Sequence, residues 1–219
     1  MKSAPASTTL GIDFGTSNSA AGALVNGAPQ VIALESGAST IPTAVFFDLE
    51  AGATLIGNAA NDALLEGAEG RYMRALKSVL GAPLMHETRQ VLRTTVTLID
   101  VIGDFLAEVK SRAEAASGHA FDYALSGRPV HFHSNDDDRD RQALADLTEC
   151  YRRAGFKGVD FMYEPEAAAI ANGAGADGSI GLIVDIGGGT SDFSLFAPDT
   201  KATHGIEIIA SHGVRVGGT

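Results

Sequence analysis

Two short segments far apart in the sequence share one order of residue types. Residues 12–19 read IDFGTSNS, and residues 184–192 read VDIGGGTSD. In each segment an apolar run leads into one aspartate, Asp13 or Asp185, and then into glycines and small hydroxyl residues. Such turns carry little side-chain bulk, so their backbone N–H groups can approach an anion closely. The repeat therefore predicts two turns that hold phosphate groups.

The two aspartates predict a metal ion near those phosphates. A charged carboxylate on an apolar strand is costly to bury unless a cation offsets it. Mg²⁺ keeps several of its waters and takes only one or two carboxylates, so a Mg²⁺ carried by a nucleotide suits Asp13 and Asp185. We expect a duplicated arrangement in which both halves face one cleft. For either copy alone, the alternative is an ordinary turn whose aspartate caps local N–H groups.

Composition limits the class of protein. The 219 residues are 45% hydrophobic and 20% charged, which is typical of a globular chain. The net charge of −11 argues against a nucleic-acid partner, because such binding needs clustered lysine and arginine. The single cysteine, Cys150, excludes a disulfide framework and a cysteine-based metal site. No signal peptide or membrane-spanning run is evident, so we expect a cytoplasmic protein without a membrane partner.

Turn signals and hydrophobic periodicity predict the elements that position these residues. Asn26-Gly27 predicts a hairpin, which puts the first phosphate turn inside an antiparallel meander. The acidic run at residues 136–138 favours a helix start over a calcium site, since it lacks the pattern of a calcium loop. His131 and His133 alternate on one strand face, but no third ligand has useful spacing, so a metal pair there is disfavoured. We expect strands at 20–25, 30–34, 43–47, 121–125, 159–163 and 180–185, and helical pattern at 58–65, 72–80, 97–113, 136–153 and 167–171.

Several motifs, taken together, resemble the DnaK-type heat-shock chaperones, within the actin and sugar-kinase superfamily. Residues 11–19 and 184–192 resemble that family's two phosphate motifs, and YEPEAAA at 163–169 resembles its connecting segment. TIPT at 40–43 and ALKSVLG at 75–81 also fall in the family's order. The resemblance extends from about residue 10 to the last residue. Two further segments, at 127–130 and 153–156, look most like a bacterial subgroup of the YegD type.

The resemblance implies a fold and a set of boundaries. It implies an α/β, actin-like (ribonuclease H-like) ATPase fold, with the first lobe complete and the second only begun. The first lobe would occupy residues 1–177, with its core at 1–37 and 96–177 and an inserted smaller subdomain at 38–95. Residues 178–219 would begin the second lobe. On this reading the chain is a fragment that lacks the adenine-holding segments and exposes apolar surface meant for the missing lobe.

The resemblance also implies roles, position by position. Asp13 and Asp185 would hold Mg²⁺ through water, and ATP or ADP would be the bound nucleotide. Lys77 would position the attacking water near the γ-phosphate, with Glu164, Asp185 and Thr190 as the other catalytic residues. The phosphates would be wrapped by Gly15, Thr16, Ser17 and Asn18 on one side, by Gly187, Gly188, Gly189 and Thr190 on the other, with Gly217 and Gly218 near the sugar and phosphates.

Two of these roles have plainer alternatives. Lys77 could be a surface lysine on a helix, although its flanking pattern favours catalysis. Glu164 could serve as an N-capping residue before Pro165, which suits a first helical turn, and both roles are compatible.

The implied function is ATP binding and hydrolysis by Mg²⁺-assisted phosphoryl transfer to water, with the 219-residue piece itself impaired or inactive. Protein clients and co-chaperones would act through the full-length parent. Two alternatives stay open: a small-molecule kinase of the same superfamily, and a nucleotide-dependent, actin-like assembly protein.

Overall fold

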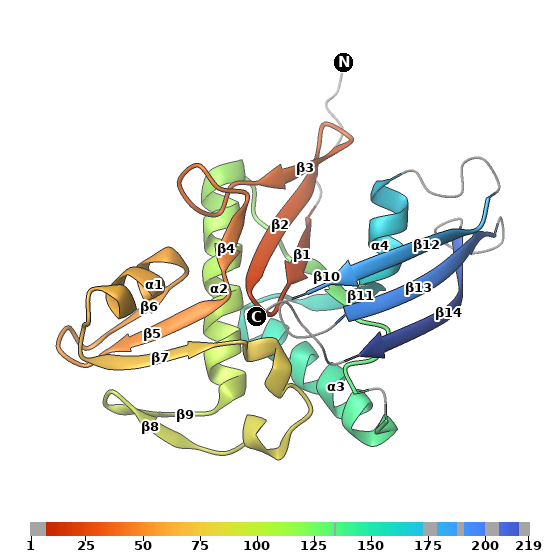
Figure 1. Cartoon of the computed structure of the whole chain (residues 1–219). Coiled ribbons are helices and arrows are strands. Elements are labelled where there is room, and N and C mark those ends of the chain that lie inside the picture. Colours follow the sequence, from red (N-terminus) through yellow and green to blue (C-terminus); the bar gives the residue numbers. More distant parts are fainter. Residues whose placement is uncertain (1–7, 134, 173–178, 188–190, 200–205, 215–219) are drawn as a thin grey trace.

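A computed structural model describes residues 8–133, 135–172, 179–187, 191–199 and 206–214. Its centre is a six-stranded sheet in the order β11-β10-β1-β2-β3, with β4 also pairing with β2 (Figure 1). The strand bounds are β1 Thr9–Phe14, β2 Asn18–Val25, β3 Ala28–Ile32, β4 Thr40–Pro42, β10 Tyr123–Arg128 and β11 Gly158–Tyr163. β1, β10 and β11 run parallel, whereas β1, β2 and β3 form the expected antiparallel meander. Asn26 and Gly27 both have positive φ in the β2–β3 turn, as the hairpin signal predicted.

Two long helices cover one face of this sheet. α2 (Leu98–Ser117) starts with a capping box between Thr97 and Asp100 and ends at Gly118, whose φ of 70° suits a glycine C-cap. α3 (Asp137–Arg153) is capped by the Asp136 side chain, which accepts from Arg139 N. Acid at the start of α3 and arginine at its end match the helix dipole, as the acidic run predicted.

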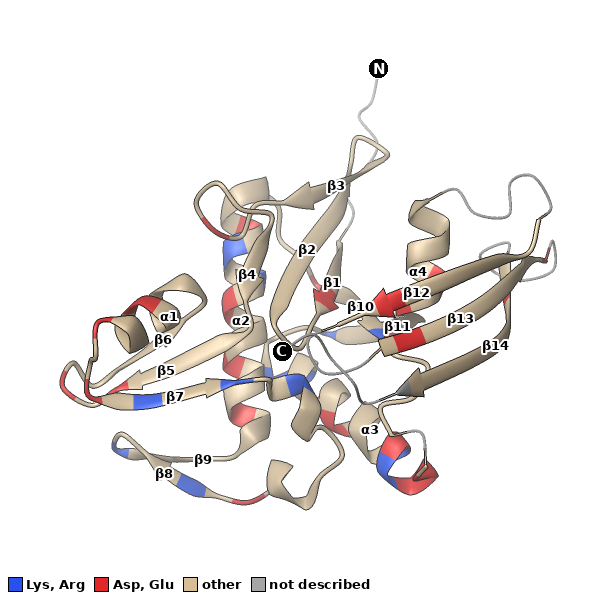
Figure 2. Ribbon diagram, viewed as in Figure 1, with Lys and Arg blue, Asp and Glu red and all other residues tan. Residues whose placement is uncertain are grey.

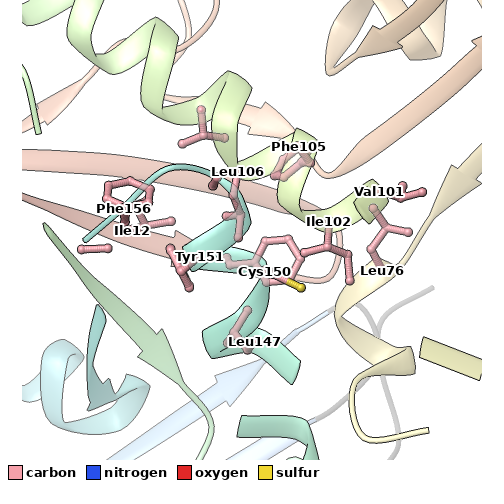
Figure 3. Packing of buried hydrophobic residues seen from close by; sticks show 14 of the residues in the cluster. Ile12, Leu76, Val101, Ile102, Phe105, Leu106, Leu147, Cys150, Tyr151 and Phe156 are labelled. Carbon is pink, nitrogen blue, oxygen red and sulfur yellow. The ribbon is translucent and has the colours of Figure 1, made fainter. Parts of the chain in front are cut away.

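The main core lies between this helix pair and the sheet. Alternate residues of β1 point into it, and its largest fully buried side chain is Tyr151, whose hydroxyl lies 2.8 Å from Ser126 Oγ. Figure 3 shows the packing around Ile102, Phe105 and Tyr151. Because the even-numbered residues of β1 are buried in this core, Asp13 lies on the opposite face of the sheet.

A smaller sheet extends from the main body beside β4. It has the order β6-β5-β7 and a short helix packed on it (Figure 1). The bounds are β5 Ala44–Asp48, β6 Ala53–Ile56, α1 Asn58–Leu65 and β7 Gly70–Arg74. Two 3-10 turns follow, η1 (Leu76–Val79) and η2 (Pro83–Met85), and then the hairpin β8 (Arg89–Val91) and β9 (Thr94–Val96).

A third sheet follows the short helix α4 (Glu164–Ala171). It is antiparallel, in the order β12-β13-β14, with bounds Gly181–Ile186, Ser191–Pro198 and Ile206–Val214. Leu182, Val184 and Ile186 are exposed on one face of β12.

Some sequence expectations need correction. Residues 72–80 do not form one helix: Tyr72 to Arg74 end strand β7, and only η1 follows. Ala75 breaks the helical pattern because it adopts a left-handed conformation (φ 55°, ψ 35°). The strand expected to stop before Gly127 continues to Arg128, because β11 pairs with it along its whole length. The lobe and subdomain boundaries remain a prediction.

Candidate functional site

The first phosphate turn lies between β1 and β2, and neighbouring strands hold its shape. At Gly15 a Cβ atom would clash with the backbone oxygen of Asn18, so only glycine fits this tight turn. Thr43 N donates to Ser17 O at 2.9 Å, and the hydroxyls of Ser19 and Thr43 lie 2.8 Å apart, both buried. The TIPT segment therefore braces the turn from the side, leaving Thr16, Ser17 and Asn18 to line a hollow.

The second aspartate occupies the matching place in the third sheet. Asp185 is the penultimate residue of β12, pairs with Asp192 of β13, and is exposed. Acidic residues lie near the ends of β1 and β12 that face each other (Figure 2). Gly187 follows β12, whereas the predicted residues Gly188, Gly189, Thr190, Gly217 and Gly218 lie outside the described residues.

Lys77 is not a surface lysine. It lies in η1, and its side chain is only 12% exposed. Its neighbours Leu76 and Leu80 are buried in the main core, so the turn is fixed to the body of the molecule on both sides of Lys77. Upstream, the left-handed Ala75 redirects the chain out of β7, a conformation that costs a non-glycine residue about 1 kcal/mol.

Lys77 points at Glu164. Lys77 Nζ donates to Glu164 Oε1 at 2.5 Å, and the Glu164 side chain is 21% exposed. Glu164 is the first residue of α4, directly before Pro165, and the N-cap is Tyr163 rather than Glu164. Glu164 is therefore not the N-cap of α4, which was the alternative role expected from the sequence. Its carboxylate faces Lys77 instead.

The charges of Asp13 and Asp185 act on one another. Water reaches Asp13, which lies in a recess where protein atoms displace much of its hydration. This loss of solvation raises the pKa of Asp13, the nearby ammonium of Lys77 opposes the rise, and the negative charge of Asp185 adds to it. The two phosphate segments thus bring their carboxylates within electrostatic range.

Glu164 belongs to the same group. Its pKa is raised, first by burial, while the charge and hydrogen bond of Lys77 oppose the rise and the charges of Asp13 and Asp185 add to it. Asp13 and Glu164 each interact with the charge of Asp185 and with one lysine, so the cluster has an excess of negative charge that a divalent cation would relieve.

Gly127, near the end of β10, lies between two of these carboxylates. A Cβ at this position would be 3.3 Å from Glu164 Cγ and 3.9 Å from Asp13 Oδ1. The sequence shows this glycine only as an apparent strand breaker, so its role as a spacer depends on the fold.

Two hollows lie near the first phosphate turn, and they differ in chemistry. One, of about 510 Å³, contains Asp13 in an otherwise mostly apolar lining from β1, β2, β3 and β10, which offers little to a phosphate. The other, of about 460 Å³, is lined by the first phosphate turn together with Thr43, Asn61, Tyr72, Arg74 and Ser78. The polar hollow is the better place for an anionic ligand, because it combines the turn with the cation of Arg74.

The donor set fits Mg²⁺ that keeps its waters. In the described parts of the chain, no three His, Cys, Asp or Glu side chains form a cage for a metal ion. Hydrated Mg²⁺ bound together with a nucleotide needs only one or two carboxylates. Asp13 and Asp185 could supply these, and the ion would offset the uncompensated negative charge near them. His133 is engaged elsewhere, with Nε2 2.8 Å from Leu80 O.

Comparison with known proteins identifies the family. The family model described as "Hsp70 protein" matches residues 9–98 and 87–201. The chain belongs to the Hsp70 family. It is 33% identical to a protein named "Chaperone protein HscA homolog" from Bordetella pertussis, over 93% of this chain and 34% of that protein. It is 31% identical to "Chaperone protein DnaK" from Thermoplasma volcanium, over 97% of this chain and 34% of that protein.

Membership of the Hsp70 family agrees with the resemblance and with the mixed α/β architecture. The YegD-type subgroup is not distinguished by these relatives and stays a prediction. The chain spans about a third of the length of the curated relatives it matches. None of the described helices has both the length and the apolar character needed to span a membrane.

Proposed function

We propose that this chain forms the first part of a nucleotide-binding unit whose full-length parent is a cytoplasmic DnaK-like chaperone that hydrolyses ATP. The grouping of Asp13, Lys77, Glu164 and Asp185 carries the proposal. Family membership supports the chaperone reading over the kinase and assembly-protein alternatives. Protein clients and co-chaperones would bind the parent.

The turns at residues 15–18 and 187–190 would wrap the phosphates with backbone N–H groups. Asp13 and Asp185 would orient Mg²⁺ through its waters. When bound, Mg²⁺ would offset negative charge on the phosphate oxygens.

Lys77 and Glu164 would place the attacking water. The ammonium can donate to the water or to a phosphate oxygen, while the carboxylate has lone pairs beyond the one used by Lys77 and can accept from the water. Because one partner donates and the other accepts, the pair can fix the direction of the attacking oxygen.

A phosphate-release assay on the full-length parent tests the proposal. We expect Mg²⁺-dependent release of phosphate from ATP that increases with unfolded peptide and not with sugars. Release that depends on a sugar would favour the kinase alternative, and ATP-dependent sedimentation of polymers would favour the assembly protein.

A further inference from the structure

The segment after Lys77 is anchored to α3 through one buried carboxylate. Asp146 has a relative exposure of 1%, and it lies on the part of α3 that faces η1 and η2. Its Oδ2 accepts from Gly81 N at 3.0 Å. Its Oδ1 accepts from Gln142 Nε2 at 2.7 Å and lies 3.0 Å from His86 Nε2.

The contact at Gly81 is close as well as polar. Gly81 has a φ of 76°, and a Cβ there would clash with the backbone oxygen of Arg139 and lie 3.1 Å from Ala143 Cβ. The backbone at Gly81 therefore lies directly against the backbone of α3. The buried side chain of His133 contacts the neighbouring residue, since its Nε2 lies 2.8 Å from Leu80 O.

These contacts bear on Lys77 because so few residues separate them. Leu80 N donates to Lys77 O at 3.4 Å, so the anchored residues connect to Lys77 through η1 itself. A buried carboxylate that accepts a backbone N–H holds position firmly, since leaving the N–H without an acceptor is costly. The left-handed conformation of Ala75 opposes this anchoring, because the strained backbone of Ala75 could relax if the turn moved away from α3.

We propose that Asp146 is a positioning residue for Lys77: by holding Gly81 and His86 against α3, it keeps the Lys77 ammonium at hydrogen-bond distance from Glu164. Asp146 is buried, and its described hydrogen-bond partners are Gly81, His86 and Gln142 rather than residues of the proposed nucleotide site. The part of the inference that concerns catalysis rests on the proposed function, whereas the structural part does not.

The test uses the side-chain ammonium signal of Lys77 in NMR of the 15N-labelled 219-residue chain. Exchange of ammonium protons with water is slow only while the group is held in a protected hydrogen bond, and Lys77→Met identifies the signal. In Asp146→Ala we expect exchange to quicken by about tenfold or the signal to vanish, in line with the loss of one hydrogen bond to a charged group. Asp146→Asn, which can still accept from Gly81 N, should restore much of the protection.

Gly81→Ala provides a second route that leaves the charges unchanged. Its added methyl should push the segment off α3 and quicken exchange in the same way, even if Asp146→Ala fails to fold. The matched control is Asp122→Asn, which breaks the exposed pair with Lys157 at 2.9 Å and should leave the Lys77 signal unchanged.

An unchanged Lys77 signal in folded Asp146→Ala or in folded Gly81→Ala would overturn the inference. In the full-length parent, positioning predicts that Asp146→Ala lowers kcat while the Kd for ATP stays the same. A quickened Lys77 signal in the Asp146→Ala form of the 219-residue chain, together with a full-length parent that has no ATPase activity, would uphold the anchor and refute the proposed function, so the two failures can be told apart.

Discussion

Lys77 Nζ and Glu164 Oε1 lie 2.5 Å apart although 87 positions separate the two residues in the sequence. The lysine comes from a 3-10 turn at the edge of the smaller sheet, and the glutamate from the first turn of α4. The fold brings them together beside Asp13 and within electrostatic range of Asp185. The pair supplies a donor and an acceptor at one point of the proposed site.

Lys77→Ala should separate binding from turnover. In the full-length parent we expect the Kd for ATP to change little and the rate of phosphate release to fall by about 100-fold or more, the range for loss of a charge-stabilising group. Single-turnover kinetics and a binding titration measure the two effects. Lys157→Ala is the matched control, and wild-type turnover in Lys77→Ala would refute the catalytic role.

Asp13→Asn and Asp185→Asn should each weaken binding of the Mg²⁺–nucleotide complex. Each substitution removes one of the charges that would orient the hydrated ion, and we expect a loss of about 10-fold or more, as for other groups that orient a metal site. Calorimetric titration with ADP, with and without Mg²⁺, measures it in the parent. Unchanged affinity in both variants would remove the metal assignment.

Asp13→Asn should stabilise the 219-residue chain when nucleotide and Mg²⁺ are absent. The partial loss of hydration in its recess holds the pKa of Asp13 above its ordinary value of 3.8, so the folded chain binds this proton more tightly than the unfolded chain. Stability is therefore lost as pH rises from 3.8 through the raised pKa, and the cost is fully present at pH 7. The asparagine avoids that cost.

Urea unfolding of wild type and Asp13→Asn at pH 7 and at a pH below 3.8 measures this effect. The advantage of the variant should be larger at pH 7, because below 3.8 the carboxyl of Asp13 is mostly protonated in both the folded and the unfolded chain. Asp122→Asn, at an exposed ion pair, should change the free energy of unfolding by about 1 kcal/mol or less. If Asp13→Asn instead lowers the free energy of unfolding, the attraction between the Asp13 carboxylate and the Lys77 ammonium outweighs the cost of the lost hydration.

Gly127→Val should impair hydrolysis through sterics alone. Even a Cβ at this position contacts Glu164 Cγ at 3.3 Å, so the larger side chain must displace the glutamate or β10. We expect turnover in the parent to fall by about 100-fold, since small misplacement in an active site has effects of this size. Gly118→Val is not a suitable control because of its positive φ, so Ala124→Gly on the same strand serves to report general damage to β10.

Much of the fold could be predicted from the sequence, because the signals involved are local. The Asn26-Gly27 hairpin and the acidic start of α3 each follow from the preferences of a few neighbouring residues. The exception at residues 72–80 is also informative. Ala75 takes a conformation that alanine avoids, and tertiary packing of Leu76 and Leu80 outweighs that local preference.

The candidate site was harder to predict, because it depends on contacts between distant segments. Motif order pointed to Lys77 and Glu164, but their hydrogen bond follows only from how η1 packs on the core. Asp146 has no sequence signal, since an aspartate inside an amphipathic helix usually faces solvent. Gly127 likewise gains its spacing role only when β10 lies beside Asp13.

The most direct test of a shared metal is a crystal structure of the full-length parent with ADP and Mn²⁺ in place of Mg²⁺. We predict one anomalous peak between Asp13 and Asp185, bridged to both carboxylates by water. A peak beside only one of them, or two separate sites, would contradict the claim that the two phosphate segments serve a single ion.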